Sequence, residues 1–597
     1  MPIVGRLRPG ATVAQAHDEI RLFQSRIGAH FPWPMPASWN RDVAVVPLAE
    51  WLVGGVRSRL LILMASVALV LVIVCANIAN LSLSRAVARE RELGIRAAIG
   101  AGPRRIARQL LTESVLLSAI GAVAGLFVAT QALAVLKLVL PPDTARLGDA
   151  HLNWRVLGFT GALAVAAGCA FGLAPVVQAL RIRLRVAMGG GGREGRQAVA
   201  WPIRIGLTVA QIACAVLLVI AAGLLVRSLW MLTRIDPGFT AEGVSAAVVS
   251  PTGPVCRTPD ACLAFYRAFE ERVQAAPGIR DAALVNTLPL TGAVAKRSLE
   301  LEGLPAEAPL FWLHTITPDY FRVMGIRLEL GRAFTRADLS GDAAVAIVPS
   351  ATARRFWPGE SPLGKHVRFA GESRWRSVVG VTADVRGFDL TRNVPNWMAG
   401  AVYVPYGLDG TMEDGRIPMD MTLAVRTAMG AGEVSEVVRR VATGLGGHVA
   451  FSEVRPMTAI VAEAVAAPAA TTSLLVTMAS LALVLGCVGV YGVLSFLVSR
   501  QTRDLGIRIA LGAQRRDVFW LVIKEGAALC LAGVALGVLG AMAVARWLAS
   551  ELYGVSPTDP ATYGSVAVVV SLVTLLACYV PTRRAMSVDP LIVLREQ

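Results

Sequence analysis

The sequence predicts an α-helical multi-pass membrane protein that carries an α+β domain outside the membrane and contains an internal duplication. Its 597 residues are 55% hydrophobic and only 17% charged, whereas soluble proteins average about 25% charged residues. Apolar runs long enough to cross a bilayer recur along the chain, and motifs from its first third return near its end. This composition excludes a single soluble enzyme, a disordered chain and a coiled coil.

Seven apolar runs predict seven transmembrane helices. A bilayer core about 30 Å thick needs roughly 20 apolar residues of helix, and each run reaches that length without Asp, Glu, Lys or Arg. Backbone groups inside lipid must bond within their own segment, so we expect helices rather than strands. The runs are Leu60–Leu83, Ser114–Leu136, Val156–Leu180, Ile205–Val226, Leu474–Val498, Gly526–Ala545 and Ala561–Pro581.

The arginines predict the orientation. Residues 85–109, 181–204, 500–520 and 582–597 hold seven, six, five and three arginines, whereas the loops at 141–153 and 551–560 hold one and none. The positive-inside rule places the arginine-rich segments in the cytoplasm, with the N-terminus outside and the C-terminus inside. These segments also explain the net charge of +16, so we expect the lipid bilayer as a partner and no nucleic acid.

Two copies of one motif reveal the internal repeat. Residues 91–105 read RELGIRAAIGAGPRR and align without a gap with RDLGIRIALGAQRRD at residues 503–517. The preceding helices also match, MASVALV at 64–70 against MASLALV at 478–484. An acid and two glycines then recur at the same spacing: Glu113, Gly121 and Gly125 against Glu525, Gly533 and Gly537. The chain is therefore a duplication.

The two copies are unequal. The second copy contains a helix, a large external domain and three helices, whereas the first contains only the end of an external domain and three helices. We therefore expect the first helix and most of the first external domain to be missing through truncation or a misassigned start codon. A naturally shortened form is the alternative.

Residues 231–468 predict an α+β domain large enough to have its own core. Short β-like runs alternate there with helices whose apolar residues share one face. The predicted strands are Ala343–Val348, Ser377–Val385, Ala401–Val404 and Met421–Arg426, and the predicted helices are Cys262–Ala275 and Glu433–Leu445.

The sequence offers no enzyme site, and we expect no cofactor and no metal. The segment GESPLGKH at 359–366 is similar to a phosphate-binding loop, but His366 replaces the hydroxyl residue that would hold magnesium. We expect a structural turn there. Asp384 and Asp389 are predicted to be ordinary loop carboxylates.

Two of the eight cysteines lie in a polar region. Cys256 and Cys262 could close a short disulfide loop in an oxidising compartment. The spacing alone leaves open whether they are bonded or free thiols.

Several motifs resemble one permease family. The segments at 91–105 and 503–517, each followed by a helix with G-x3-G, resemble the FtsX-like permease domain of MacB-type ABC transporters and lipoprotein-extracting permeases. External motifs extend this resemblance over nearly the whole chain to the duplicated permeases called ADOP, first noted in Acidobacteria. These motifs are PDYFRVMGI (318–326), GRAFTRAD (331–338), RRFWPGESPLGKHV (354–367), VVGVTADV (378–385) and VYVPY (402–406). The missing N-terminal helix and domain depart from the family pattern.

The resemblance implies a bacterial inner or plasma membrane protein with a MacB-like periplasmic core domain and an ATPase on a separate polypeptide. Together with the repeat it predicts six regions. They are a remnant of the first extracytoplasmic domain (1–57), a first FtsX-like permease domain with three helices (58–180), a cytoplasmic linker (181–204), a transmembrane helix (205–230), the MacB-like periplasmic core domain (231–468) and a second FtsX-like permease domain with three helices (469–597).

Two arginine-rich turns suit the transmission of force from an ATPase. Each keeps an acid, Gly-Ile-Arg and a closing glycine, namely Glu92, Gly94, Ile95, Arg96 and Gly100 in the first copy and Asp504, Gly506, Ile507, Arg508 and Gly512 in the second. By resemblance these are the ATPase-coupling elements. The alternative is that the arginines only set topology and contact anionic lipid, but topology requires neither the glycines nor the acids.

The resulting prediction is the permease subunit of an ABC-type transporter. It would not be an enzyme, and it would transmit force from a separate cytoplasmic ATPase to the extracytoplasmic domain for export or extraction of an unknown substrate. A periplasmic partner is compatible with this role. The alternative is a membrane signalling or scaffold protein that regulates an envelope protein. An ion-driven carrier is disfavoured because the centres of the apolar runs lack ionisable residues.

Overall fold

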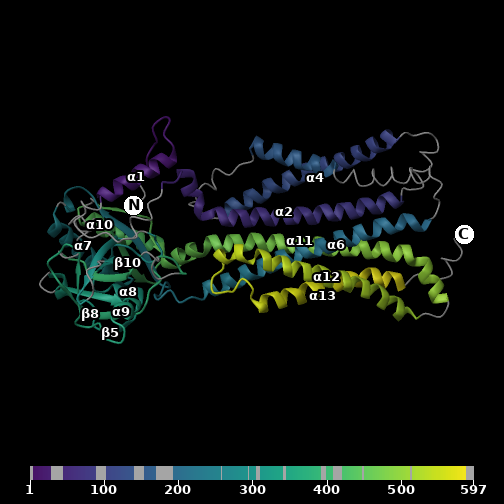
Figure 1. The fold of residues 1–597 in the computed structure, drawn as a ribbon. Helices are drawn as coiled ribbons and strands as arrows, with labels where there is room; N and C mark the ends of the chain where they lie inside the picture. The colour runs from purple at the N-terminus through teal and green to yellow at the C-terminus, as the bar shows by residue number, and fades with distance from the viewer. Residues whose placement is uncertain are drawn as a thin grey trace. The chain divides into compact units, whose positions relative to one another are not determined.

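The structure is a computed structural model that describes residues 4–27, 45–88, 103–139, 153–169, 193–256, 258–292, 295–303, 309–340, 344–391, 398–407, 420–446, 449–510 and 514–586. The chain forms two compact units, which we call the sheet unit and the helical unit (Figure 1). The sheet unit joins residues 1–58 and 228–470, and the helical unit joins residues 59–227 and 471–597.

The helical unit consists of long apolar helices. Their bounds are α2 (Leu48–Ala88), α4 (Pro103–Val139), a helix over Trp154–Cys169, α6 (Arg193–Thr233), α11 (Met457–Ala510), α12 (Arg515–Leu548) and α13 (Pro560–Met586), with a 3-10 turn η4 (Ala549–Glu551) between the last two. The chain passes between the two units within α2, α6 and α11.

In the described residues, 6 helices are long and apolar enough to cross a membrane. They confirm six of the predicted crossings: Arg57–Ser82, Leu111–Ala134, Arg204–Thr233, Met457–Phe496, Ile523–Glu551 and Pro560–Tyr579. The seventh predicted run, Val156–Leu180, is described only as far as Cys169 and is helical to that point. Helix α6 begins at Arg193, within the predicted linker 181–204.

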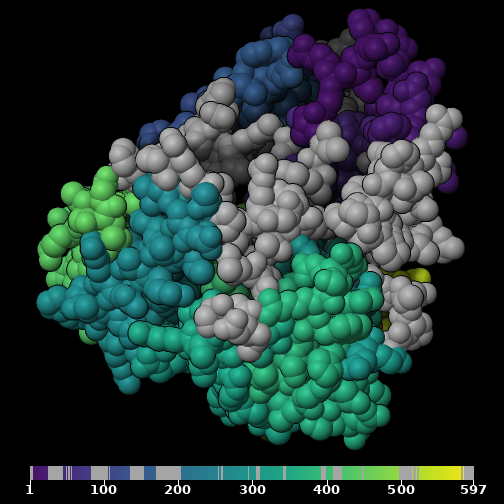
Figure 2. All heavy atoms as spheres, turned by 90° about the vertical axis from the view of Figure 1, so that its left-hand side faces the viewer, coloured from purple at the N-terminus to yellow at the C-terminus, as the bar shows by residue number. Residues whose placement is uncertain are grey.

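The sheet unit is an α+β domain (Figure 1). Figure 2 shows the heavy atoms of much of this unit in teal and green. Its helices are α1 (Val13–Ile27), α7 (Pro259–Gln274), α8 (Tyr320–Met324), α9 (Ser350–Phe356) and α10 (Ala431–Gly444), with 3-10 turns η2 (Gly253–Cys256) and η3 (Arg336–Ser340). Its strands are β1 (Val244–Pro251), β2 (Ile279–Val285), β3 (Ala295–Leu301), β4 (Leu310–Ile316), β5 (Leu328–Gly331), β6 (Val345–Pro349), β7 (His366–Phe369), β8 (Arg376–Thr382), β9 (Gly400–Pro405), β10 (Met421–Thr427), β11 (Val449–Phe451) and β12 (Arg455–Pro456). All four strands and both helices predicted within residues 231–468 are present.

Ten of the strands follow one another in the sheet in the order β11-β1-β10-β2-β4-β3-β7-β8-β6-β9, while β12 also pairs with β1 and β5 also pairs with β8. A parallel pairing of β4 with β9 closes the last six of these strands into a ring. The pairing runs from Phe311 opposite Gly400 to Ile316 opposite Pro405. Alternate residues of these two strands therefore share either the interior or the outer face of the ring.

Helices cover both faces of the open part of the sheet. On β2, Ala282 and Leu284 pack with α7 and α10, whereas Ala283 and Val285 pack with α8 on the other face. Two local signals fix where these covering helices begin. Thr258 caps α7 by accepting a hydrogen bond from the backbone N–H of Ala261, and the Glu433 side chain accepts one from the backbone N–H of Gly430 at the start of α10.

One carboxyl group in this unit is held away from water. Glu270 on α7 accepts a hydrogen bond of 2.6 Å from the Thr317 hydroxyl, which in turn accepts one from the backbone N–H of Leu284. Burial raises the pKa of Glu270 from 4.5 to about 7, and the Thr317 hydrogen bond only partly offsets this effect.

The raised pKa predicts a pH-dependent stability. Below pH 4.5 the Glu270 carboxyl is protonated in both folded and unfolded chains, so it contributes nothing. Between pH 4.5 and about 7 the unfolded chain ionises this carboxyl while the folded chain keeps it protonated, so the folded state loses up to about 3 kcal/mol of stability, and the full loss is present above pH 7. We expect Glu270→Gln to raise the thermal unfolding temperature at pH 8 and to change it little at pH 4.5. An equal effect at both pH values would contradict the assignment.

Candidate functional site

A cluster of polar side chains lies among the apolar helices of the helical unit. Asn77 and Asn80 belong to α2, and Thr208 and Gln211 belong to α6. Gln211 and Thr208 are fully buried, and each asparagine is only 7% exposed. Polar groups in such segments usually lie between helices, where they hydrogen-bond to one another.

The Leu485 carbonyl on α11 accepts hydrogen bonds from two of these side chains. The Gln211 amide donates to the Leu485 oxygen at 2.7 Å and to the Asn77 side-chain oxygen at 3.1 Å. The Asn77 amide donates to the same Leu485 oxygen at 2.9 Å. Three helices, α2, α6 and α11, are therefore joined at one point.

Gly489 gives the two amides access to this carbonyl. It lies one helical turn after Leu485, and a Cβ atom there would lie 2.4 Å from the Gln211 amide nitrogen and 2.6 Å from the Asn77 side-chain oxygen. Real Cβ atoms do not approach other heavy atoms so closely, so a side chain at 489 would displace the hydrogen bonds. A Cβ atom built at Gly492, also on α11, would have no other atom within 4 Å.

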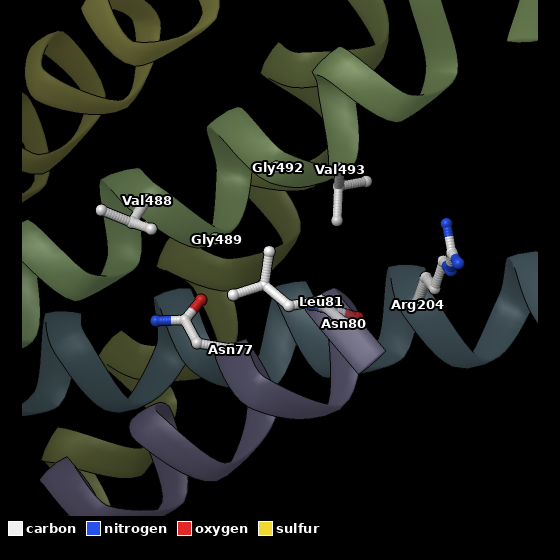
Figure 3. Close-up of a pocket in the computed structure, with 8 residues that line it drawn as sticks. All are labelled: Asn77, Asn80, Leu81, Arg204, Val488, Gly489, Gly492 and Val493. Atoms are coloured by element: carbon white, nitrogen blue, oxygen red, sulfur yellow. The ribbon is translucent and has the colours of Figure 1, made fainter. Parts of the chain in front are cut away.

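The cluster continues to Arg204 on α6 (Figure 3). Asn80 donates to the Thr208 hydroxyl at 3.5 Å, and the Arg204 guanidinium lies over the Phe496 ring, 3.9 Å from its centre. Asn77, Asn80, Arg204, Gly489 and Gly492 help line a cavity of about 20 Å³, room for one water molecule.

This chemistry holds helices in register. Amides and a hydroxyl donate and accept hydrogen bonds but do not exchange protons near neutral pH. Among the described residues no group of three or more His, Cys, Asp or Glu side chains could hold a metal ion.

Helix α12 packs against α6 through glycines. A Cβ atom at Gly533 would lie 2.6 Å from Ile212, and one at Gly537 would lie 2.6 Å from Val216 and 2.7 Å from the Ala213 carbonyl oxygen. The two helices therefore approach so closely that no side chain fits between them at these positions, as small residues four apart allow.

The equivalent glycines of the first copy have no such neighbour. Constructed Cβ atoms at Gly121 and Gly125 on α4 meet nothing within 4 Å, and none of the described α4 side chains is buried. Helix α4 does contact the helix Trp154–Cys169, where Gly168 approaches Val115 and Ser118. The duplicated sequence thus serves two different packing environments.

The predicted coupling residues fall into two groups. Glu92, Gly94, Ile95, Arg96, Gly100 and Gly512 lie outside the described residues. Residues 504–508, which include Asp504, Gly506, Ile507 and Arg508, lie in the last turns of α11. The sequence predicted an arginine-rich turn here, but the structure continues helix α11 to Ala510.

The two other sequence signals lie in the sheet unit. The sulfur atoms of Cys256 and Cys262 are bonded, with their Cα atoms 4.4 Å apart. The segment 359–366 is a turn in which Gly359 and Gly364 adopt left-handed backbone conformations and Lys365 pairs with Glu360 at 2.6 Å. This lysine is therefore committed to a neighbouring carboxylate.

The polar cluster itself was missed in the sequence. Asn77, Asn80 and Gln211 interrupt otherwise apolar runs, and an uncharged polar residue in such a run is the signal that could have found them. Nothing in the sequence indicates that Asn77 and Gln211 share one carbonyl on a helix more than 270 residues away.

Comparisons with known proteins match three regions of the chain. The family described as FtsX-like permease C-terminal matches residues 64–184 and 476–590. The family described as MacB-like periplasmic core domain matches residues 205–442. The repeated match agrees with the internal duplication, and the three matched regions together cover most of the chain.

Curated relatives are export proteins with a permease part. The macrolide export ATP-binding/permease protein MacB of Hahella chejuensis is 30% identical over 47% of this chain and 42% of its own length. The probable syringafactin export ATP-binding/permease protein SyfD of Pseudomonas syringae pv. tomato is 27% identical over 47% of this chain and 41% of its own length. The chain thus matches less than half the length of these relatives. The periplasmic region of MacB from Actinobacillus actinomycetemcomitans aligns with 37% of this chain and 94% of its own, at 16% identity and a TM-score of 0.25.

The access provided by Gly489 predicts the effect of adding a methyl group. We expect Gly489→Ala to destabilise the detergent-solubilised protein by about 1–3 kcal/mol, because the new Cβ overlaps two hydrogen-bonded amides. Gly492→Ala is the matched control and should be neutral or stabilising by up to about 1 kcal/mol, since alanine favours helix over glycine. Equal unfolding temperatures for the two variants would show that the amide cluster does not depend on Gly489.

Because only the second-copy glycine packs against another helix, we expect the two copies to differ in how well they tolerate a glycine-to-alanine substitution. We expect Gly537→Ala to lower by several degrees the temperature at which half of the monodisperse protein is lost on size-exclusion chromatography, because its Cβ overlaps Val216. Gly125→Ala, the same change at the equivalent position, should leave that temperature unchanged or slightly raised. A larger loss for Gly125→Ala than for Gly537→Ala would contradict this packing.

Proposed function

We propose, because this chain belongs to the FtsX-like permeases with a MacB-like periplasmic core domain, that it is the permease subunit of an ABC-type transporter. In this proposal a separate cytoplasmic subunit hydrolyses ATP, and the permease passes the resulting force to the MacB-like domain for export or extraction of a substrate. The observation that carries the proposal is the arrangement of the matches, in which two permease segments flank one periplasmic core domain. The relatives' names, which specify ATP-binding/permease export proteins, agree with it.

The end of α11 supports a role in coupling. The apolar span of this helix ends at Phe496, but the helix itself continues to Ala510. Asp504 and Arg508 are four residues apart and therefore lie on one face of the extension. A force applied there would act directly on a membrane-spanning helix, because successive backbone hydrogen bonds make the helix a stiff rod.

The polar cluster supports transmission beyond α11. The Leu485 carbonyl of α11 holds Gln211 of α6 and Asn77 of α2. A displacement of α11 would therefore move α6 and α2 with it or break hydrogen bonds that few other groups in an apolar environment could replace. Both α6 and α11 continue along the chain into the sheet unit.

The orientation in this proposal follows the arginines. The segments 85–109, 181–204, 500–520 and 582–597 face the cytoplasm, the N-terminus and the MacB-like domain lie outside, and the C-terminus lies inside. The partners are then the bilayer, a cytoplasmic ATPase that binds the two arginine-rich segments, and a substrate or protein on the outer side.

The coupling role predicts a specific effect of charge reversal. We expect the double variant Arg96→Glu, Arg508→Glu to co-purify with at least ten-fold less ATPase than the tagged wild-type chain. The reason is that both guanidinium groups, which would meet acidic residues of the partner, are replaced by carboxylates. The measurement is the ATPase-to-permease ratio after affinity purification, determined by quantitative mass spectrometry.

A matched control separates coupling from topology. The double variant Arg91→Glu, Arg503→Glu changes the same charge in the same two segments, but residue 503 lies on a different helical face from 508. It should retain the ATPase. Equal loss in both variants would mean that the arginines act through topology or lipid alone. Absence of any ATPase from the wild-type preparation would contradict the proposed function.

A further inference from the structure

The turn between α12 and α13 carries two carboxylates that bind arginines of two other helices. Glu551, the last residue of η4, accepts a hydrogen bond from Arg59 Nε of α2 at 3.0 Å. Asp559, the residue before α13, accepts one from Arg227 of α6. Because aspartate, glutamate and arginine side chains are ordinarily charged at pH 7, both contacts are ion pairs. We call these two ion pairs the ionic clasp.

The ionic clasp lies where two helices leave the helical unit. That unit joins residues 59–227 and 471–597, so Arg59 and Arg227 are the end residues of its first part. Helices α2 and α6 both continue beyond these arginines into the sheet unit, whereas the turn between α12 and α13 belongs wholly to the helical unit. The ionic clasp therefore holds the exit points of both helices on one short turn.

Asp559 also fixes the start of α13. Its Oδ2 atom, which pairs with Arg227, accepts hydrogen bonds from the backbone N–H of Thr562 at 2.9 Å and from the Thr562 hydroxyl at 2.6 Å. A Cβ atom at Gly223 of α6 would lie 3.1 Å from the Thr562 methyl carbon, so α6 and the first turn of α13 are in contact. An asparagine at 559 would still cap the helix but would lack the charge.

Water and lipid can replace the contacts of this turn. The side chains of the two carboxylates are 16% and 15% exposed, and those of their arginines are 27% and 38% exposed. Ion pairs that water reaches are weak and are screened by salt. Leu548 and Leu552, at the same turn, pack in apolar clusters with residues of α6. Lipid tails offer these leucines a similar apolar surface when the helices part.

The polar cluster cannot be exchanged in this way. Gln211 is fully buried, and its amide and that of Asn77 donate to the Leu485 carbonyl among apolar helices. Lipid offers no hydrogen-bonding group in their place. Farther along α12, Gly533 and Gly537 hold this helix against α6 in contacts too close for any side chain. Of these contacts, those of the ionic clasp therefore break at the least cost.

We propose that the ionic clasp is a conformational device that opens and closes. When it opens, the turn between α12 and α13 separates from α2 and α6, and α12 pivots about its contacts at Gly533 and Gly537. The Leu485 carbonyl meanwhile keeps α2, α6 and α11 together. The inference concerns the helical unit alone and does not depend on the proposed transport function.

The test is hydrogen–deuterium exchange, measured by mass spectrometry on the full chain in detergent micelles. The double variant Glu551→Gln, Asp559→Asn removes both negative charges and keeps the size of the side chains and the cap of α13. We expect the amides of residues 545–563 and 222–233 to exchange at least three-fold faster in this variant than in the wild type. Residues 205–215 and 480–492, which contain the polar cluster on α6 and α11, should exchange at the wild-type rate. Raising NaCl from about 0.05 to about 0.5 M should produce the same pattern in the wild type, because salt screens exposed charges.

Further variants make the test specific. Glu463→Gln removes the same kind of charge from an ion pair with Arg455 at the start of α11 and should leave exchange at the turn unchanged. Arg59→Glu places two carboxylates together and should accelerate exchange at the turn, whereas the charge-swapped chain Arg59→Glu, Glu551→Arg should return it to near the wild-type rate. Equal acceleration at the turn and at the polar cluster would overturn the proposal, because the ion pairs would then stabilise the bundle as a whole. So would exchange at the turn that neither the double variant nor salt alters.

Discussion

The close approach of helix α6 to its neighbours is the constraint on which the helical unit depends. Lipid offers no hydrophobic drive for helices to associate, so tight packing and hydrogen bonds must hold them together. At α6 both require missing side chains: Gly533 and Gly537 admit α12, and Gly489 admits two amides to a carbonyl of α11. One methyl group at any of these positions would occupy space that is already filled.

The duplication shows how context decides what a repeated motif does. Gly537 and Gly125 occupy equivalent positions in the two copies, yet only Gly537 contacts a second helix in the described residues. The polar cluster joins the two copies, because Asn77 of the first copy donates a hydrogen bond to the Leu485 carbonyl of the second.

The sheet unit solves a different problem with a closed ring of strands. Pairing of β4 with β9 directs Leu313 and Val402 into the apolar interior, and the alternate residues His314 and Tyr403 to the outer face. Residues of α9 and of the segment after β8 line one cavity together with His314 and Tyr403 of that face.

The sequence by itself determined the elements whose hydrogen bonds are local. Apolar runs predicted six described membrane helices because a helix in lipid satisfies its backbone hydrogen bonds within its own segment. The internal repeat could be identified because an alignment of residues requires no knowledge of the structure. It did not reveal that residues 503–510 prolong α11, nor whether Cys256 and Cys262 are bonded. Tertiary structure alone decided that Gln211 meets Leu485 and that the ring of His314 on β4 stacks on Tyr403 of β9. Those contacts join residues far apart in the chain, and local periodicity carries no information about which distant atoms will satisfy a buried polar group.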